Sequence, residues 1–311
     1  MTPEQDELRA TVRKLLEREA DPWPALCAIG VPALAVPEEH GGLGAGLTEL
    51  RIVAEELGRV LSDVPFLGSA VATRAVLTTG DEQLLPRLAE GTVAALAWTG
   101  EDGRWDTAVC RGDLSTVDGQ AHYVLDGDTA EILLVAAGDG LYEVDPADAV
   151  REHVPSLDET RRFATVTFDH TPARRLGPLD LGPVRDVACL VLAAEQTGAA
   201  ARALELTVEY TKQRHQFGRP IGSFQALKHR MADLHVLVET ARSAAYADLP
   251  AVAKVHCSEV LSAVAAEMIQ LHGGIAITWE HPAHRYFQRA HSSALLFGTP
   301  HHHLPRIRRE W

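Results

Sequence analysis

The residues best suited to chemistry in this chain form a basic and aromatic turn between two helical patterns. In YTKQRHQFGRPIGSFQALKHRMAD, residues 210–233, Gly218 interrupts the first pattern and Ser223 is placed to cap the next helix. Arg214 then falls in the last turn of the first helix, near Phe217. A guanidinium fork beside a flat ring suits an anionic group attached to a base, such as a nucleotide pyrophosphate. The structural alternative is an arginine that simply interacts favourably with the helix dipole.

A second candidate ligand site follows in QLHGGIAITWEHPAHRYFQRA, residues 270–290. A helical pattern ends there at Gly273 and Gly274, after the amide side chain of Gln270. Paired glycines let the backbone come close to a ligand, and the Gln270 amide could bond a heterocycle or a phosphate. The structural alternative is an ordinary helix C-cap.

A third stretch, HSSALLFGTPHHH at residues 291–303, combines histidines with an uncharged strip from Ser292 to Pro300. Histidines suggest a metal, but the rings of consecutive histidines diverge on a helix or a strand. Metal sites usually space their ligands so that they share a face. The pattern therefore favours a solvated C-terminal turn over a metal site for His301, His302 and His303.

Two helical regions and one β region must position these residues. Residues 1–95 alternate helical patterns with proline and glycine clusters, which predicts an N-terminal helical domain. Residues 96–178 predict a small, shortened β domain, because four segments are rich in Val, Leu, Tyr and Phe and are bounded by turn residues: HYVLDG, EILLVAA, GLYEVD and FATVTFD. In residues 179–311 apolar positions recur at intervals of three and four residues, over three long stretches and a shorter last one. The expected fold is mainly α, with a small β domain and a C-terminal four-helix bundle.

Composition excludes several classes of protein. A net charge of −14 argues against a nucleic-acid binder, because that affinity rests largely on Lys and Arg. The four cysteines are far apart and follow no secretory signal, so we expect reduced thiols and a cytoplasmic location. No apolar run approaches the roughly 20 residues that cross a bilayer, so no membrane segment is expected.

Together, in this order and spacing, the two glycine-containing motifs resemble the acyl-CoA dehydrogenase family. GVPALAVPEEHGGLGAG and AEELGRVLSDVPFL are similar to its N-terminal helical domain, and the β region resembles its middle domain. The resemblance implies an FAD that is bound across a subunit interface. It also implies that the residues matching the family's R-x-Q-F-G and Q-x-x-G-G segments reach the pyrophosphate and adenine of the neighbouring subunit's flavin: Arg214, Gln216, Phe217, Gln270, Gly273 and Gly274.

The resemblance fails at the catalytic base. Family members remove an α-proton from an acyl-CoA with a glutamate, which often precedes a Gly-Thr pair; here Phe297 precedes Gly298 and Thr299. A second group in the family carries the glutamate on the first long C-terminal helix, where the match gives Ala188. Glu195 lies seven residues further on, about two turns, so it could be a displaced base. The alternative is a carboxylate that is satisfied by a neighbouring helix.

The flavin clamp of the middle domain departs from the family as well. Members usually have a T-E-P-x-x-G-S-D-like loop, whereas this chain has TGEDGRWD at residues 99–106. After Gly127 the chain runs almost directly into the next strand, which leaves little room for a second flavin-contacting segment.

This asymmetry resembles an actinobacterial branch of the family that forms α2β2 heterotetramers, often for CoA thioesters of steroid side chains. The resemblance implies an acyl-CoA substrate, an electron-transferring flavoprotein and an unlike, acyl-CoA dehydrogenase-like partner subunit that carries the catalytic glutamate. The leading hypothesis is therefore a half-site subunit. Two others stay open: a homomeric dehydrogenase that uses Glu195, and a flavin-free acyl-CoA-binding scaffold.

Overall fold

The computed structural model describes residues 1–310, and their contacts divide them into two compact units. Unit 1 holds residues 1–53 and 63–191. Unit 2 holds residues 54–62 and the described residues from 192 onward. Two helices run from one unit into the other, α3 (Leu47–Arg59) and α6 (Leu181–Gln213).

Unit 1 opens with helices, as the pattern predicts. The first helix begins with a capping box. Thr2 Oγ1 accepts from the Gln5 N–H at 3.3 Å, and Gln5 Oε1 accepts from the Thr2 N–H at 3.0 Å. A 3-10 turn, η1 (Glu38–His40), lies between the second and third helices. Besides α3, the helices of this part are α1 (Pro3–Leu16), α2 (Trp23–Ala28), α4 (Phe66–Thr79) and α5 (Leu85–Ala89).

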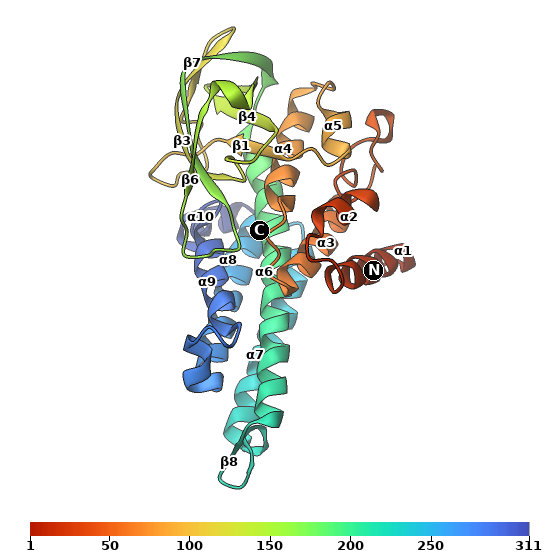
Figure 1. The fold of residues 1–311 in the computed structure, drawn as a ribbon, viewed down its shortest axis with the longest axis vertical. Helices are drawn as coiled ribbons and strands as arrows, with labels where there is room; N and C mark the ends of the chain where they lie inside the picture. The colour runs from red at the N-terminus through yellow and green to blue at the C-terminus, as the bar shows by residue number, and fades with distance from the viewer. Residues whose placement is uncertain (311) are drawn as a thin grey trace. The chain divides into compact units, whose positions relative to one another are not determined.

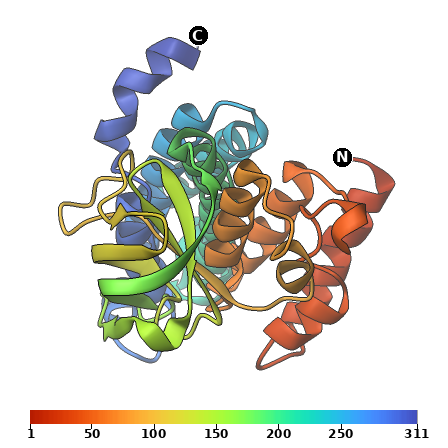
Figure 2. The same ribbon diagram turned by 90° about the horizontal axis from the view of Figure 1, so that it is seen from above.

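A seven-stranded sheet completes unit 1, in the order β1-β4-β5-β7-β3-β2, with β6 paired to β7. All pairs are antiparallel except β1 with β4, where Ala94 pairs with Ile132. Each of the four segments predicted to be extended contributes to a strand. Figure 2 shows this sheet in yellow to green, with the orange α4 packed beside it on β1. The strands are β1 (Ala94–Ala97), β2 (Arg111–Gly112), β3 (Thr116–Leu125), β4 (Ile132–Ala137), β5 (Gly140–Val144), β6 (Val150–Val154) and β7 (Phe163–Pro178), with η2 (Pro146–Asp148) before β6.

Unit 2 is a bundle of long helices with two short ones where the pattern predicts one. The expected last helix is interrupted because Phe297 and Gly298 have φ of +58° and +101°, outside the helical range, and Pro300 starts a new helix. A small hairpin joins the first two helices (Figure 1). The elements are α6, β8 (His215–Gln216), β9 (Arg219–Pro220), η3 (Ile221–Ser223), α7 (Gln225–Tyr246), α8 (Pro250–His272), η4 (Gly273–Ile277), α9 (Ala283–Leu295) and α10 (Pro300–Glu310).

Two glycines allow α3 and α6 to cross in close contact within unit 2. A Cβ on Gly58 would lie 2.0 Å from the backbone oxygen of Glu195, and a Cβ on Gly198 would lie 1.8 Å from that of Glu55. Real Cβ atoms do not approach a backbone oxygen so closely, so both positions require glycine for packing. The crossing fixes the backbone of Glu195, the one carboxylate in this region that the sequence proposes as a base.

By length and composition alone, two helical spans are long and apolar enough to cross a membrane: Leu181–Gln213 and Pro250–Ile277. The most apolar stretch of the first span is 89 % buried, and the most apolar stretch of the second span is 44 % buried. Length and apolar composition alone do not separate a membrane helix from the core helix of a bundle. The expectation of no membrane segment stays a prediction.

Candidate functional site

The first motif lies on the exposed hairpin at the end of α6. The Arg214 N–H still donates to the Tyr210 carbonyl at 2.8 Å, and the Arg214 carbonyl accepts from Ile221 N–H at 2.8 Å, which closes the turn. Ser223, expected to cap α7, instead donates its hydroxyl to the Pro220 carbonyl at 2.7 Å, and Phe224 is the N-cap. Among the side chains that the structure describes, the Arg214 guanidinium has no ion-pair partner.

Among the residues that the structure describes, Phe217 is the most exposed large hydrophobic, at 92 %. It sits at the tip of the hairpin with φ of +54°, a backbone region that costs a bulky residue energy. Gln216 beside it and Arg214 are exposed as well. The hairpin therefore presents an arginine, an amide and an aromatic ring outward.

The second motif lies at the C-terminal end of α8. Gln270 is exposed in the last turn of the helix. Gly273 ends the helix with φ of +65°, which explains one of the two glycines as a C-cap. A Cβ at Gly273 or at Gly274 would meet no atom within 4 Å, so neither glycine is required for packing within this chain. The backbone at both positions is open to a ligand.

An aromatic stack joins the two motifs at one end of the bundle. Tyr210, four residues before Arg214, donates its hydroxyl to the His272 carbonyl at 3.2 Å, and their rings stack with centroids 4.3 Å apart. His281 extends the stack, with its ring 4.3 Å from that of His272. In Figure 1 the end of α6 below the α7 label, and the hairpin at β8, mark this end of unit 2. The sequence interpretation missed the stack, although three histidines and a tryptophan within residues 272–284 are a signal for it.

Burial favours the neutral form of the two imidazoles in the stack. The His272 Nδ1–H donates to the Met268 carbonyl at 2.7 Å, so Nε2 is the unprotonated nitrogen. Burial lowers the pKa of His272, and burial together with the nearby His284 lowers the pKa of His281. Both shifts favour the uncharged form of the His272 and His281 rings.

Phe297 occupies the turn where the family match places a glutamate. It is 1 % exposed, and its carbonyl accepts from the Nε2–H of His303 at 2.9 Å. Arg306 donates to the other ring nitrogen of His303 at 3.1 Å, which fixes that tautomer. The expected solvated turn is therefore wrong for His303, which is buried and braces the turn, whereas His301 and His302 are exposed.

A buried lysine fixes the other side of the same turn. Lys254 on α8 donates from Nζ to the carbonyls of Ser293 and Ala294, at 2.9 and 3.0 Å, and to Ser258 Oγ at 3.2 Å. A cation at the last carbonyls of a helix interacts favourably with the helix dipole, so Lys254 stabilises the end of α9. The segment that carries the base in relatives is here a closed, braced turn around a phenyl ring.

The displaced base proposed from sequence is part of a buried ion pair. Glu195 is 8 % exposed, and its Oε1 accepts from Arg289 Nη1 on α9 at 2.5 Å. The other terminal nitrogen of Arg289 donates to the Ser62 carbonyl at 3.1 Å. Ala188, the second family position, is a fully buried apolar residue of α6. Glu195 is thus the carboxylate satisfied by a neighbouring helix, which was the structural alternative.

The loop in place of the flavin clamp is closed on itself in unit 1. The rings of Trp98 and Trp105 meet edge to face at 5.3 Å, and both are buried. The Thr99 hydroxyl donates to the Arg104 carbonyl. Between the two strands, β3 passes into β4 through a tight turn in which the backbone carbonyl of Asp126 accepts from the Thr129 N–H at 3.0 Å. Both observations agree with a chain that lacks the usual clamp.

Asp126 places a buried carboxyl in that tight turn. Its Oδ2 lies 3.0 Å from where a Cβ of Gly68, on α4, would be. Burial raises the pKa of Asp126 to about 7, an effect that the nearby Arg161 partly offsets. The folded chain therefore holds a proton here that an unfolded aspartate releases near pH 3.9.

We expect Asp126→Asn to stabilise the protein in mild alkali. Because the folded pKa is the higher one, the contribution of Asp126 to stability is fully present below about pH 4 and is lost as pH rises through about 7. The amide carries no charge, and asparagine tolerates the φ of +55° found here. The free energy of unfolding should rise by about 1 to 3 kcal/mol at about pH 8 and vary less from about pH 4 to 7, as measured by urea unfolding. An unchanged or lower value at about pH 8 would contradict the assignment.

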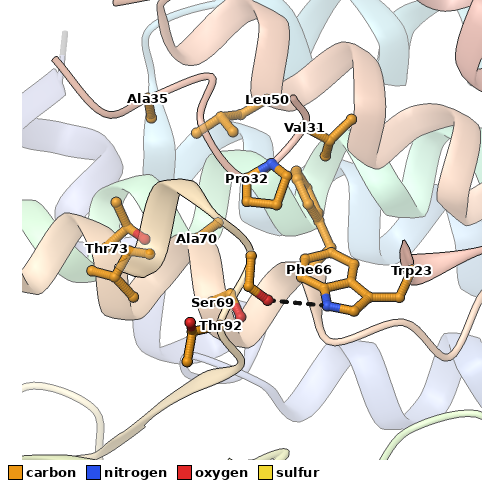
Figure 3. Close-up of a pocket in the computed structure, with 12 residues that line it drawn as sticks. Trp23, Val31, Pro32, Ala35, Leu50, Phe66, Ser69, Ala70, Thr73 and Thr92 are labelled. Carbon is orange, nitrogen blue, oxygen red and sulfur yellow. Dashed lines mark hydrogen bonds between the residues drawn. The ribbon is translucent and has the colours of Figure 1, made fainter. Parts of the chain in front are cut away.

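A cavity in unit 1 is too small for a substrate. It measures about 20 Å³, room for about one water molecule, and Trp23 Nε1–H donates to the Gly91 carbonyl in its wall at 3.3 Å (Figure 3). Its lining is mainly apolar and comes from the N-terminal helices: Trp23, Val31, Pro32, Ala35, Leu50, Phe66, Ser69, Ala70, Thr73, Leu88, Gly91 and Thr92.

Comparison with known proteins assigns the family. The family profile "Acyl-CoA dehydrogenase, N-terminal domain" matches residues 2–92, and "Acyl-CoA dehydrogenase, C-terminal domain" matches residues 186–310. The chain is 42 % identical to acyl-CoA dehydrogenase IpdE2 of Mycolicibacterium smegmatis, over 100 % of this chain and 99 % of that protein.

Two solved structures are similar to the chain over nearly its whole length. One is a variant of the Tcur3481-Tcur3483 steroid ACAD, with a TM-score of 0.86, 30 % identity, and coverage of 98 % of this chain and 97 % of that one. The other is the ChsE4-ChsE5 complex from Mycobacterium tuberculosis, with a TM-score of 0.89, 26 % identity, and coverage of 100 % and 97 %. On the family profiles and this identity, the chain belongs to the acyl-CoA dehydrogenase family, whose members are FAD-dependent oxidoreductases.

Proposed function

We propose that the chain is the half-site subunit of a heteromeric acyl-CoA dehydrogenase. It completes the FAD site of an unlike subunit, and that subunit supplies the glutamate that removes the α-proton of the acyl-CoA. One observation carries the proposal: the chain keeps the exposed residues that would reach another subunit's flavin, but a buried phenylalanine fills the base position. Phenylalanine has no group that accepts a proton.

The exposed residues fit the group that they would hold. An unpaired guanidinium at Arg214 suits a pyrophosphate, and the amide of Gln270 suits a heterocycle or phosphate oxygen. The open backbone at Gly273 and Gly274 leaves room for close approach. When bound, FAD supplies the acceptor for the β-hydride of the acyl chain.

The relatives support the assembly and the substrate class. The names of two similar structures describe a steroid ACAD of two components and a complex of two components. We therefore propose an α2β2 assembly in the cytoplasm that desaturates a CoA thioester, with a steroid side chain as the acyl group. The proposal also includes an electron-transferring flavoprotein as the acceptor of the electrons.

Two other functions predict different flavin contents. A homomeric enzyme would need Glu195 as its base, but that carboxylate is held by Arg289 inside the bundle. A flavin-free scaffold would leave Arg214 and Gln270 without a role. A purified homomer with one flavin per chain would favour the first of these, and a heteromer without flavin would favour the second.

We expect Arg214→Ala to weaken FAD retention in the assembled complex. Charge-assisted hydrogen bonds contribute roughly 1.5 to 3 kcal/mol each, which corresponds to a loss of about 10- to 150-fold in affinity. Arg219→Ala is a matched control, because the guanidinium of Arg219 lies on the same hairpin but packs over the ring of Phe224 at 4.0 Å. Flavin absorbance after gel filtration measures the effect. Equal flavin affinity in the Arg214→Ala and wild-type complexes would remove the function proposed for this motif.

A further inference from the structure

Exposed apolar side chains of unit 2 gather beside the two motifs. In the described part of unit 2, the three most exposed large hydrophobics are Phe217 at 92 %, and Ile277 and Trp279 at 78 % each. Phe217 lies within the first motif, and the other two follow Gly274 by three and five residues. Single exposed apolar residues are ordinary, but a group of them at one end of a bundle indicates an interaction surface.

The structure holds the Trp279 ring in a defined place. The ring meets the imidazole of His284 edge to face, with centroids 4.8 Å apart. His284 is itself fixed, because its Nδ1–H donates to the His281 carbonyl at 2.9 Å. The turn that precedes Trp279 is closed by the Thr278 hydroxyl, which donates to the Ile275 carbonyl at 2.8 Å. A supported ring loses little conformational freedom when it is covered, so it is suited to a contact that contributes much binding energy.

We propose that Trp279, with Ile277, is the anchor by which the chain binds its unlike partner subunit. The inference rests on the proposed function. If Arg214 and Gln270 reach a flavin carried by the other subunit, that subunit must lie over the residues that flank them, and Trp279 is the largest exposed side chain there. Buried tryptophans are the most frequent residues to dominate interface energies.

The chemistry of the ring defines the site on the partner. The indole N–H of Trp279 has no acceptor among the side chains and backbone that the structure describes. An indole that becomes buried at an interface needs one. The partner should therefore offer an apolar pocket with a carbonyl or carboxylate oxygen at its base. A second copy of this chain and the flavin itself are the other occupants that an experiment must separate.

Assembly without flavin tests the anchor directly. The chain is co-expressed with a candidate partner, an acyl-CoA dehydrogenase-like chain from the same organism that keeps the catalytic glutamate. FAD is then removed, and the dissociation constant of the apo-complex is measured by analytical ultracentrifugation. We expect Trp279→Ala to weaken assembly by about 30-fold or more and Trp279→Phe to weaken it less, because phenylalanine keeps the apolar contact and loses only the N–H. Leu114→Ala is the control, since Leu114 is 91 % exposed in unit 1 and should leave assembly unchanged.

The possible outcomes separate the anchor from the proposed function. Wild-type assembly by a folded Trp279→Ala chain overturns the anchor, and so does a variant that assembles normally but loses flavin, which would place the ring on the cofactor. If the same substitution instead dissociates a homodimer of this chain, the occupant is a second copy and the inference is wrong. The proposed function itself is judged separately, by the flavin affinity of the Arg214→Ala complex.

Discussion

Replacing Glu195 with glutamine should lower the free energy of unfolding by about 3 to 5 kcal/mol, because it leaves the buried Arg289 cation without its counter-charge. The pair is almost completely removed from water, with side-chain exposures of 10 % for Glu195 and 1 % for Arg289. Urea unfolding of the wild-type and variant chains measures the loss.

A matched substitution on the same helix should cost much less. Glu205 pairs with Arg59 at 2.7 Å and Arg202 at 3.0 Å, but its side chain is 43 % exposed, so Glu205→Gln should cost about 1 kcal/mol or less. Combining Glu195→Gln with Arg289→Met should recover part of the loss, since both charges are then gone. A cost below about 1 kcal/mol for Glu195→Gln alone would show that the ion pair does not hold the bundle together.

The second large effect is catalytic. Neither Phe297 nor Ala188 takes a proton, and loss of a general base typically lowers the rate by a factor of roughly 10² to 10⁴. The chain alone should therefore oxidise acyl-CoA little or not at all, and activity should appear when the unlike partner is co-expressed. Dye reduction with an acyl-CoA substrate measures both. Full activity of the purified homomer would contradict the expectation.

Local sequence patterns predict where the exposed residues of the candidate site lie along the helices. The residue types at Gly218 and Gly273 predict that the helical pattern is interrupted there, since only glycine adopts positive φ at little cost. Once the breaks are placed, Arg214 and Gln270 must lie near helix ends, where the structure has them. The strands of the middle region follow in the same way from short β-branched and aromatic segments between turn residues.

The buried half depends on partners that are distant in sequence. Glu195 meets Arg289 across 94 positions, so no local pattern indicates that this carboxylate is paired. His301, His302 and His303 are adjacent residues of one type, so no local pattern indicates that the ring of His303 is the one that reaches the Phe297 carbonyl. The contact of Lys254 is equally unpredictable from local sequence. A lysine in an apolar stretch does not indicate which distant helix end it will bind.

The most direct test of the half-site account compares two glutamates in the reconstituted complex. One variant carries glutamine at the partner's catalytic glutamate, and the other carries Glu195→Gln in this chain, with folding of both verified by circular dichroism. We expect the partner variant to lose acyl-CoA-dependent dye reduction by a factor of roughly 10² to 10⁴, while a folded Glu195→Gln complex keeps its turnover. If Glu195→Gln abolishes turnover and the partner variant stays active, this chain holds the base and the half-site account is wrong.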